Sequence, residues 1–405
     1  FVDLVVQGEG EEAFYNILER IKEGIFDFND VSGVTYKSEN KIIDNPPSYQ
    51  YRLEDQDYEL NLEDFTECEY FYYETSRGCP FKCCYCLWDK RPKRKIRVYS
   101  LNKVKRDLQQ IFRLLKLKFL TLIDSNLLLK RDRALEIFRL LNQLTHERAK
   151  KKLEPLNFTL ETPPEYLDEE IIKELVKFLT NRRDTSSFGY GLQTINPNTL
   201  KTMNRRLNLG KFTQNVRKAR EMGLKKTLVE IIHGLPGDTL DSFKKTLDYL
   251  ISELNVENFH SLHFYLIPNS FFWRHAKEYG LAYEPKAPYR LISADTFPEE
   301  DLNEADRLSF YLQIIYTGIP RIRKEVDMKF KKNKLLVYEK IIDRISKKYG
   351  HLFSVSNDEQ YLFKVLRNIR KPENYELKQK IINEARDIIR NMSLSEDVFP
   401  RREHD

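Results

Sequence analysis

Five cysteines gathered in one short segment constrain this chain more than any other feature of its sequence. They are Cys68, Cys79, Cys83, Cys84 and Cys86, and the 405-residue chain has no others. A disulfide framework ties distant segments together, which a single cluster cannot do. The sequence therefore favours a metal or redox site in a reducing compartment, and we expect a cytoplasmic protein.

Three of these cysteines have the spacing of a metal-binding loop. Cys79, Cys83 and Cys86 form C-x3-C-x2-C within the segment ETSRGCPFKCCYCLWDK. Thiolates at this spacing can converge on one inorganic centre. A closed zinc site needs four ligands, and no second Cys/His pair of this kind follows, so an iron–sulfur cluster with one open iron fits better. We interpret Cys68 and Cys84 as structural, and two thiols cannot hold a second four-cysteine cluster.

From residue 71 onward, short apolar segments alternate with long amphipathic ones, as in parallel α/β proteins. The expected strands are Phe71–Ser76, Lys118–Asp124, Leu156–Thr162, Ser187–Thr194, Lys225–His233 and His260–Ile267. The expected helices are Leu101–Leu115, Arg131–Lys151, Asp168–Thr180, Asn198–Met222, Asp238–Leu254 and Phe271–Tyr279. Six such units predict an α/β fold, a partial (β/α)6 barrel of the TIM type, with its chemistry at the carboxyl ends of the strands.

The regions on either side of this barrel differ from it. Residues 1–6 read as a buried strand followed by a helix, an α/β remnant over residues 1–30, and short strands with a linker follow over 31–66. After the barrel at 67–290, residues 291–405 predict an all-helical region with helices Glu299–Thr317, Arg321–Lys348, Glu359–Arg370 and Glu376–Met392. Because the chain opens on Phe1 within a strand, we expect it to be part of something longer.

Composition excludes several classes of protein. A hydrophobic fraction of 41% is too high for general disorder, and no apolar run reaches the ~20 residues of a membrane span. The net charge of +6 is too small to indicate nucleic-acid binding. The basic stretch 321–334 reads as a solvated helix face, with a docking surface for an acidic partner as the alternative.

The cysteine segment resembles the signature of the radical S-adenosylmethionine (SAM) superfamily, C-x3-C-x-aromatic-C, with Tyr85 as the aromatic residue. The resemblance implies that Cys79, Cys83 and Cys86 hold a [4Fe–4S] cluster whose open iron binds SAM. It also implies reductive cleavage of SAM to a 5′-deoxyadenosyl radical that abstracts hydrogen from a substrate. Such enzymes take electrons from an external donor of the flavodoxin or ferredoxin kind.

Further motifs are similar to those of the cobalamin-associated and coproporphyrinogen-dehydrogenase-like members. By that resemblance Glu161 in FTLETPP, Gln193 in YGLQT and Glu230 in LVEIIHGLPGDT contact SAM, although the family usually has Asp at the position of Glu230. Arg205 matches the arginine that pairs with the methionyl carboxylate, a task suited to a guanidinium. We interpret His233 as a packing residue, and His260 and His263, which alternate on the sixth strand, as satisfied core or surface residues.

The first residues carry a resemblance of their own. VDLVVQGEGEEAF is similar to the last strand, loop and helix of a cobalamin-binding domain. The D-x-H-x-x-G signature of the cobalt-ligating histidine is absent from this chain. Cobalamin is therefore an expected cofactor whose site is not complete here.

The sequence leaves the reaction open between methyl transfer, ring formation and another C–H functionalisation. We expect a small-molecule or peptide substrate and no nucleic-acid partner. Two alternatives remain: a catalytically incomplete fragment, and a zinc-dependent nucleic-acid-binding module. Radical modification of tRNA normally brings an additional RNA-binding domain, which an all-helical tail does not offer.

Overall fold

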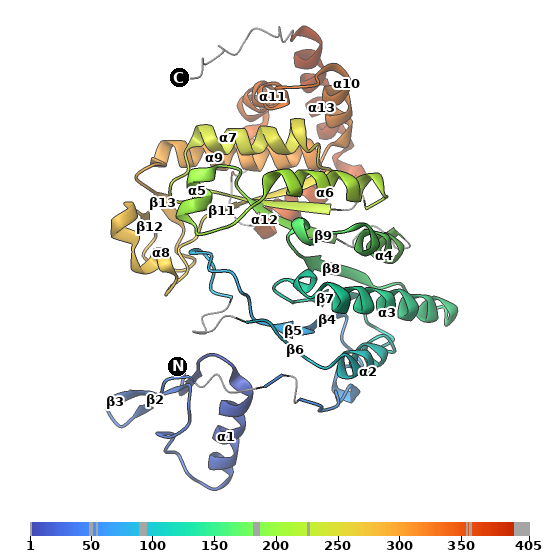
Figure 1. Cartoon of the computed structure of the whole chain (residues 1–405). Coiled ribbons are helices and arrows are strands. Elements are labelled where there is room, and N and C mark those ends of the chain that lie inside the picture. Colours follow the sequence, from blue (N-terminus) through green and yellow to red (C-terminus); the bar gives the residue numbers. More distant parts are fainter. Residues whose placement is uncertain are drawn as a thin grey trace.

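A six-stranded parallel sheet organises the protein (Figure 1). The computed structural model describes residues 2–47, 52–53, 56–88, 95–180, 187–224, 227–353, 355 and 359–392. The strands lie in chain order across the sheet and end at its two edges, β4 and β11, so the predicted open barrel is confirmed. They are β4 (Tyr70–Tyr73), β7 (Phe119–Leu122), β8 (Asn157–Glu161), β9 (Ser187–Gln193), β10 (Thr227–His233) and β11 (Asn258–His263).

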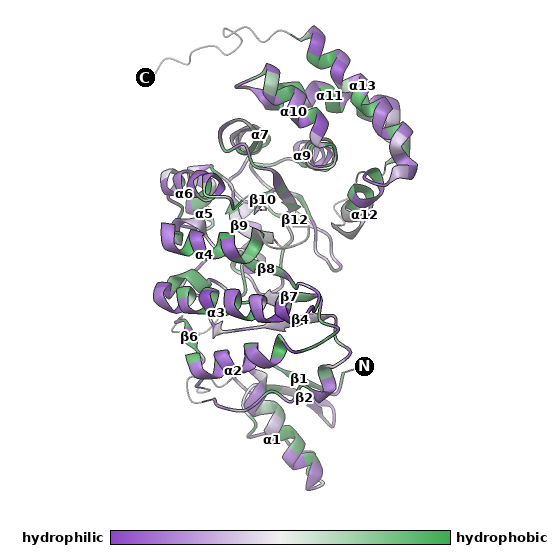
Figure 2. Cartoon of the chain, turned by 90° about the vertical axis from the view of Figure 1, so that its right-hand side faces the viewer, coloured by the Kyte–Doolittle hydropathy of each residue, from purple (hydrophilic) through white to green (hydrophobic). Residues whose placement is uncertain are grey.

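Helices follow the strands and cover one face of the sheet (Figure 2). They are α2 (Leu101–Ile111), α3 (Arg131–Lys150), α4 (Glu169–Thr180), α5 (Pro197–Thr202), α6 (Leu209–Glu221) and α7 (Leu240–Asp248). Strand β10 shows why the sheet needs this cover, because every second side chain along it is buried, including Val229 and Ile231. The other side chains of β10 face the inside of the barrel.

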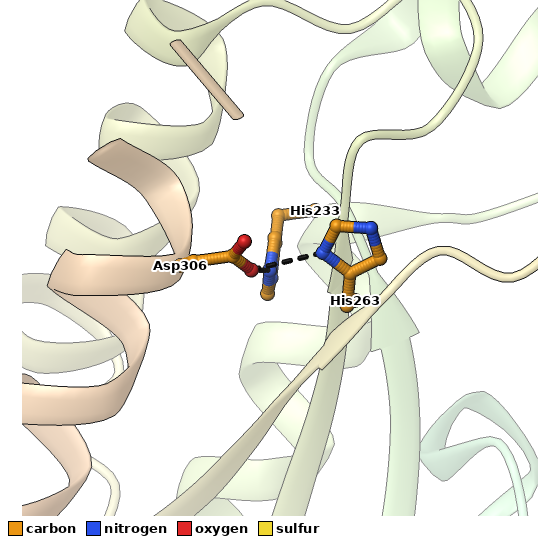
Figure 3. A group of neighbouring side chains, drawn as sticks. All are labelled: His233, His263 and Asp306. Atoms are coloured by element: carbon orange, nitrogen blue, oxygen red, sulfur yellow. Dashed lines mark hydrogen bonds and ion pairs between the residues drawn. The ribbon is translucent and has the colours of Figure 1, made fainter. Parts of the chain in front are cut away.

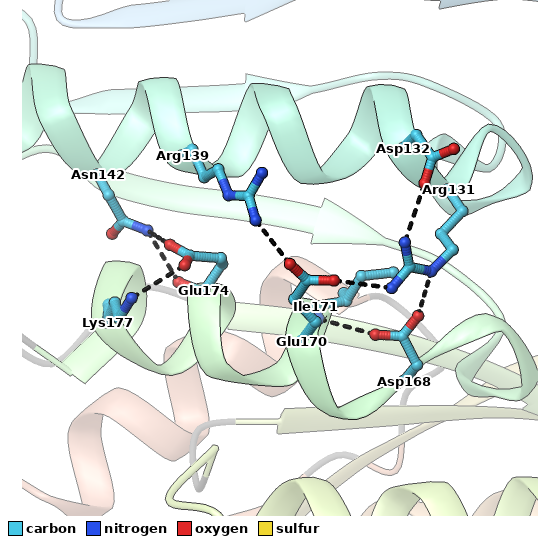
Figure 4. Close-up of polar contacts among 9 residues, drawn as sticks. All are labelled: Arg131, Asp132, Arg139, Asn142, Asp168, Glu170, Ile171, Glu174 and Lys177. Carbon is cyan, nitrogen blue, oxygen red and sulfur yellow. Dashed lines mark hydrogen bonds and ion pairs between the residues drawn. The ribbon is translucent and has the colours of Figure 1, made fainter.

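Polar contacts on the outer surface join α3 to α4 (Figure 4). Arg131 contacts Asp168 and Glu170, and Arg139 donates to Glu170 at 2.6 Å. Exposed ion pairs of this kind contribute only about 0–1 kcal/mol each. The packing of the two helices therefore depends mainly on their apolar faces.

Several predicted boundaries are wrong, and in two helices the reason is a single asparagine with positive φ. The expected helix Asn198–Met222 is two helices, because Asn204 has a positive φ of 50° and Asn208 caps α6 through the amide of Lys211. The expected helix Arg321–Lys348 divides into α10 (Pro320–Lys329) and α11 (Lys334–Tyr349) at Asn333, where φ is 53°. The sixth strand is Asn258–His263 rather than His260–Ile267. The start of the fifth expected strand, residues 225–226, lies outside the described residues.

The N-terminal unit is a small sheet with its own core. Strands β1 (Leu4–Val6), β2 (Val34–Ser38) and β3 (Lys41–Asp44) pair antiparallel beside α1 (Gly10–Lys22). Its core consists of Ala13, Ile17, Phe28, Val31, Val34 and Tyr36. The prediction that residues 1–6 form a buried strand is wrong, since β1 is an edge strand and Val5 is 49% exposed.

Ion pairs attach this unit to the barrel. Arg97 contacts Glu9 with one nitrogen at 3.0 Å, and Arg77 reaches Glu11 at 2.6 Å. Both arginines belong to a short antiparallel pair, β5 (Ser76–Arg77) with β6 (Arg97–Val98), next to the first barrel strand. The N-terminal unit therefore lies against the segment that carries the cysteines.

The C-terminal region is helical, as predicted. After α8 (Phe271–Arg274), β12 (Ala282–Tyr283) and β13 (Leu291–Ser293) come α9 (Glu299–Leu312), α10 (Pro320–Lys329), α11 (Lys334–Tyr349), α12 (Glu359–Ile369) and α13 (Tyr375–Asn391). Several cations of the basic stretch serve this packing. Lys329 donates to the carbonyls of Ile389 and Arg390 at the end of α13, and the buried Lys334 pairs with Asp327 at 2.6 Å.

A buried polar cluster joins the barrel to this helical region (Figure 3). Asp306 on α9 accepts hydrogen bonds from His233 at 2.8 Å and His263 at 2.9 Å, at the ends of β10 and β11. Arg290 pairs with the second carboxylate oxygen. Burial alone would raise the pKa of Asp306, but the hydrogen bonds from the two histidines hold it far below its ordinary value. Both histidines are buried and hydrogen-bonded, so His233 does more than the packing expected of it from the sequence.

No helix among the described residues combines the length and apolar character that a membrane span requires.

Candidate functional site

The cysteine loop begins where β5 ends and is held by hydrogen bonds to the barrel. Ser125, just after β7, donates to the carbonyl of Gly78. The amide of Cys84 donates to Met203 at 2.9 Å, and Asn204 donates to the carbonyl of Lys82 at 3.1 Å. Loop residues on both sides of Cys83 are thus tied to the connection between α5 and α6.

The three predicted ligands lie together on this loop. The amide of Cys86 donates to the carbonyl of Cys83 at 3.2 Å, which makes a tight turn between them. All five cysteines are partly buried and form no disulfide with one another. Burial raises the pKa of the Cys79 thiol, so a bound cation is needed to favour its thiolate.

Tyr85 and Arg205 meet beside Cys83. Arg205 donates to the Tyr85 hydroxyl at 3.0 Å and to the carbonyl of Gly191 on β9. The Cys83 thiol contacts both side chains. Burial raises the pKa of the Tyr85 phenol, so this group stays neutral. The break between α5 and α6, which the sequence did not predict, is what brings Arg205 to this point.

Gln193 ends β9 in an unusual backbone conformation. Its φ is 71°, and the pairing of β9 with β10 shifts by one residue at this point. A Cβ atom on Gly191 would lie 2.7 Å from the side-chain amide nitrogen (Nε2) of Gln193. Glycine at position 191 therefore leaves room for Gln193 above the strand, next to Arg205.

The two predicted glutamates lie on the strands that flank β9. Glu161 ends β8 opposite Gly189, where a Cβ atom would come within 2.7 Å of the Glu161 Cγ. Glu161 is exposed as a residue, but the surrounding protein removes water from its carboxyl group. This desolvation raises the pKa of the carboxyl. Glu230, on β10, pairs in register with Gly191 on β9. The structure thus unites Cys83, Tyr85, Gln193 and Arg205 and sets the glutamates on neighbouring strands.

Two acidic residues at this end of the barrel were missed from the sequence. The buried Asp124, just after β7, accepts from the amide and hydroxyl of Thr75 at 3.1 and 2.8 Å and also from Ser76. Glu165, in the turn after β8, is partly buried, which raises the pKa of its carboxyl, and the charge of Arg205 acts on that carboxyl. An acidic residue directly after a buried strand was the signal for Asp124.

Several buried polar atoms around Arg205 have no hydrogen-bond partner among the described residues. They are the Arg205 Nε, the Gln193 Oε1 and the Glu165 Oε2. Buried polar groups are normally paired, because each unpaired one costs roughly 1–3 kcal/mol. A donor, two acceptors and three nearby thiols fit a polar, charged ligand chelated to a cluster.

A large hollow lies between the N-terminal unit and the cysteine loop. Its volume is about 1240 Å³, and its wall includes Gln7, Gly8, Glu9, Arg77 and Trp88. The wall is therefore shared between the loop after β1 and the cysteine loop.

Comparison with known proteins agrees with this geometry. Residues 73–250 match the sequence model of the Radical SAM superfamily. The chain is 26% identical over 324 residues to 2-(S-pantetheinyl)-carbapenam-3-carboxylate methyltransferase of Streptantibioticus cattleyicolor, covering 76% of this chain and 45% of that protein. It is 25% identical to the cobalamin-dependent radical SAM methyltransferase TokK of Streptomyces tokunonensis, covering 71% of this chain and 43% of that protein.

The fold is also similar to a solved structure. The cobalamin-dependent S-adenosylmethionine radical enzyme OxsB with aqua-cobalamin bound aligns with a TM-score of 0.60 at 14% identity, covering 97% of this chain and 66% of OxsB. The chain spans less than half the length of the two curated relatives. The family match, the parallel barrel and the cysteine loop together identify residues 73–250 as a radical SAM domain.

Proposed function

We propose that this chain binds a [4Fe–4S] cluster and SAM and belongs to an enzyme that transfers methyl groups by radical chemistry. The observation that carries the proposal is the three-cysteine loop held beside Tyr85 and Arg205, with unpaired buried polar atoms around it. Methyl transfer is favoured because two curated relatives are named as methyltransferases.

Each site residue has a role that follows from its chemistry. Cys79, Cys83 and Cys86 ligate the cluster, which leaves one iron open for SAM. When bound, these two groups supply a 5′-deoxyadenosyl radical that abstracts hydrogen from the substrate. Arg205 holds the methionyl carboxylate through its planar fork of donors.

The remaining side chains orient the bound SAM. The Gln193 oxygen accepts a hydrogen bond from it, and Tyr85 keeps Arg205 in position. Glu161 and Glu230 contact its polar groups from the strands on either side.

The second cofactor and the partners are also proposals. Cobalamin would lie in the hollow between the N-terminal unit and the cysteine loop, and its site is not complete in these residues because the cobalt-ligating motif is absent from them. We propose a cytoplasmic protein that takes electrons from a flavodoxin-like or ferredoxin-like donor and acts on a small molecule or peptide. Of the domains proposed from the sequence, 1–30, 31–66, 67–290 and 291–405, we keep the last two as proposals and join the strands of 31–66 to the first, because they share its sheet and core.

Anaerobic reconstitution with iron and sulfide tests the proposal. We expect about four irons per chain, and 5′-deoxyadenosine should form when SAM and a strong reductant are added. The Cys83→Ala variant should lose both while keeping its circular dichroism spectrum. Stoichiometric zinc without iron would favour the zinc-binding alternative, and a loaded cluster that never yields 5′-deoxyadenosine would favour an incomplete fragment.

A further inference from the structure

The cysteine loop has a second, smaller hollow on its outer side. This hollow has a volume of about 330 Å³. The loop contributes one wall, with Cys83 and Cys86 among its residues, and α8 contributes the opposite wall. Neither Tyr85 nor Arg205 belongs to its lining. The cysteines can therefore be approached from outside without crossing the side on which Arg205 lies.

The lining of this outer hollow is basic. Apart from the cysteines, its ionisable residues are Lys82, Arg274 and His275, and none of its lining residues is a carboxylic acid. His275 contacts Glu278 at 2.9 Å, just outside the lining, so the positive charge of the surface comes from Lys82 and Arg274. Lys82 and Arg274 are exposed. The large hollow on the other side of the loop includes Glu9 and Glu11 beside Arg77 in its lining, so carboxylates line that side of the loop and none line this one.

An exposed aromatic side chain lies within the same surface. Phe271 at the start of α8 is 38% exposed and stacks on the His275 ring with 4.2 Å between ring centroids. Aromatic residues among cations are typical of protein interfaces, where the ring supplies contact area and the charges steer the partner. The loop side of the surface is held in place by the Asn204 contact with the carbonyl of Lys82.

We propose that Lys82, Phe271, Arg274 and His275, here called the outer basic surface, dock an acidic protein that carries a one-electron reductant. The inference rests on the proposed function, because the cluster held by Cys79, Cys83 and Cys86 is the electron acceptor. One electron leaves the partner's reduced cofactor and reduces the cluster by one unit, and no bond forms or breaks. Electron transfer between proteins weakens steeply with distance, so a partner must dock close to the cysteines.

The test compares a protein reductant with a small one on the cluster-loaded full chain. Reduced flavodoxin serves as the acidic protein and reduced methyl viologen as the small donor. The measured quantities are the affinity of flavodoxin for the chain, which charge reversal should weaken, and the initial rate of 5′-deoxyadenosine formation. In the Lys82→Glu/Arg274→Glu variant, we expect the flavodoxin-driven rate to fall about tenfold, while the viologen-driven rate does not fall. Added KCl should slow the flavodoxin reaction of the wild type towards the rate of the variant.

The matched control is Lys150→Glu/Lys151→Glu, which makes the same change in charge on two exposed lysines at the far end of α3 and should leave both rates unchanged. Because Lys82 adjoins Cys83, Arg274→Glu alone is the second variant, and it should show a smaller loss in the same direction. Equal flavodoxin rates in all variants, or an equal loss with both reductants, would overturn the docking surface. Failure of the wild type with viologen would instead overturn the proposed function.

Discussion

Two polar clusters at the carboxyl edge of the barrel sheet differ in how well their atoms are paired. Around Asp306, both carboxylate oxygens accept hydrogen bonds, and the cluster joins β10 and β11 to α9. Around Arg205, buried nitrogen and oxygen atoms have no partner among the described residues. The chain itself supplies the hydrogen-bond partners of Asp306, whereas the buried polar atoms around Arg205 need partners from a bound ligand.

This difference separates stability from function. A buried group that is fully paired stabilises the fold, and removing one partner leaves an uncompensated charge. A buried group that lacks a partner already costs stability, which a protein tolerates where a ligand supplies the missing contact. Histidines and a carboxylate in one buried cluster could suggest a metal site, yet here they hydrogen-bond to one another and Arg290 balances the charge of Asp306.

The largest expected effect is on the paired cluster. Asp306→Ala should lower the free energy of unfolding by about 3–5 kcal/mol, because it leaves Arg290 and two histidines without their shared acceptor. Urea denaturation followed by circular dichroism measures the change. The control is Asp343→Ala, which removes a partner of Arg307 at the surface and should cost no more than about 1 kcal/mol. A loss at Asp306 no greater than that of the control would contradict the comparison.

The next effect concerns the unpaired cluster. Arg205→Lys should lower kcat/KM for SAM cleavage about 10- to 100-fold, since a single ammonium replaces a fork of donors. The melting temperature should change less than in Asp306→Ala, because lysine keeps the positive charge and can still donate to the Tyr85 hydroxyl or the Gly191 carbonyl. Steady-state assays of 5′-deoxyadenosine and thermal denaturation give the two readouts. The opposite result, a lower melting temperature with unchanged kcat/KM, would make Arg205 a structural residue.

The third prediction concerns pH: the free energy of unfolding should fall in mild acid because of the buried His233. Burial lowers the pKa of His233, so the unfolded chain takes up a proton near pH 6.5 that the folded chain does not. Stability is therefore lost as pH falls below 6.5, by at most about 1.4 kcal/mol per pH unit for this one group. The contribution of Asp306, whose folded pKa is lowered, persists above pH 3.8 and is lost only in stronger acid.

Urea denaturation at pH 7.5 and 5.5 tests this pH dependence. His233→Gln keeps a side-chain donor for Asp306 but does not titrate, so its stability should fall less over the same range. An identical pH dependence in wild type and variant would assign the acid sensitivity to other groups.

Most of the barrel could be predicted from the sequence, because each apolar strand is short and each following helix is amphipathic. The spacing of apolar residues predicts where such elements lie, but it does not show which single residue ends a helix. Asn204 and Asn333 take left-handed conformations inside otherwise helical patterns, and this divided two predicted helices. The exposed edge strand β1 was predicted as buried, since the sequence does not tell how many neighbours a strand has.

The site was less predictable than the fold. The cysteine spacing alone indicated a metal-binding loop, since its ligands are local in sequence. The contact of Arg205 with Tyr85 joins residues far apart in the chain, and only a resemblance to known enzymes suggested a shared role. Glu165 was missed because a lone glutamate after a strand looks like any surface residue until its burial is known.

The smallest expected effect belongs to the cysteine between two proposed ligands. Cys84→Ser should leave the iron content and the rate of 5′-deoxyadenosine formation unchanged, because its role in the loop is carried by its backbone amide, which donates to Met203 at 2.9 Å. The hydroxyl is close in size to the thiol, so the loop should keep its shape. Iron analysis after anaerobic reconstitution, with Cys83→Ala in parallel, measures the difference. If Cys84→Ser lost iron as Cys83→Ala should, the loop would use a different set of ligands. Cys84 would then belong to the groups that need a bound partner, with Arg205 and Gln193.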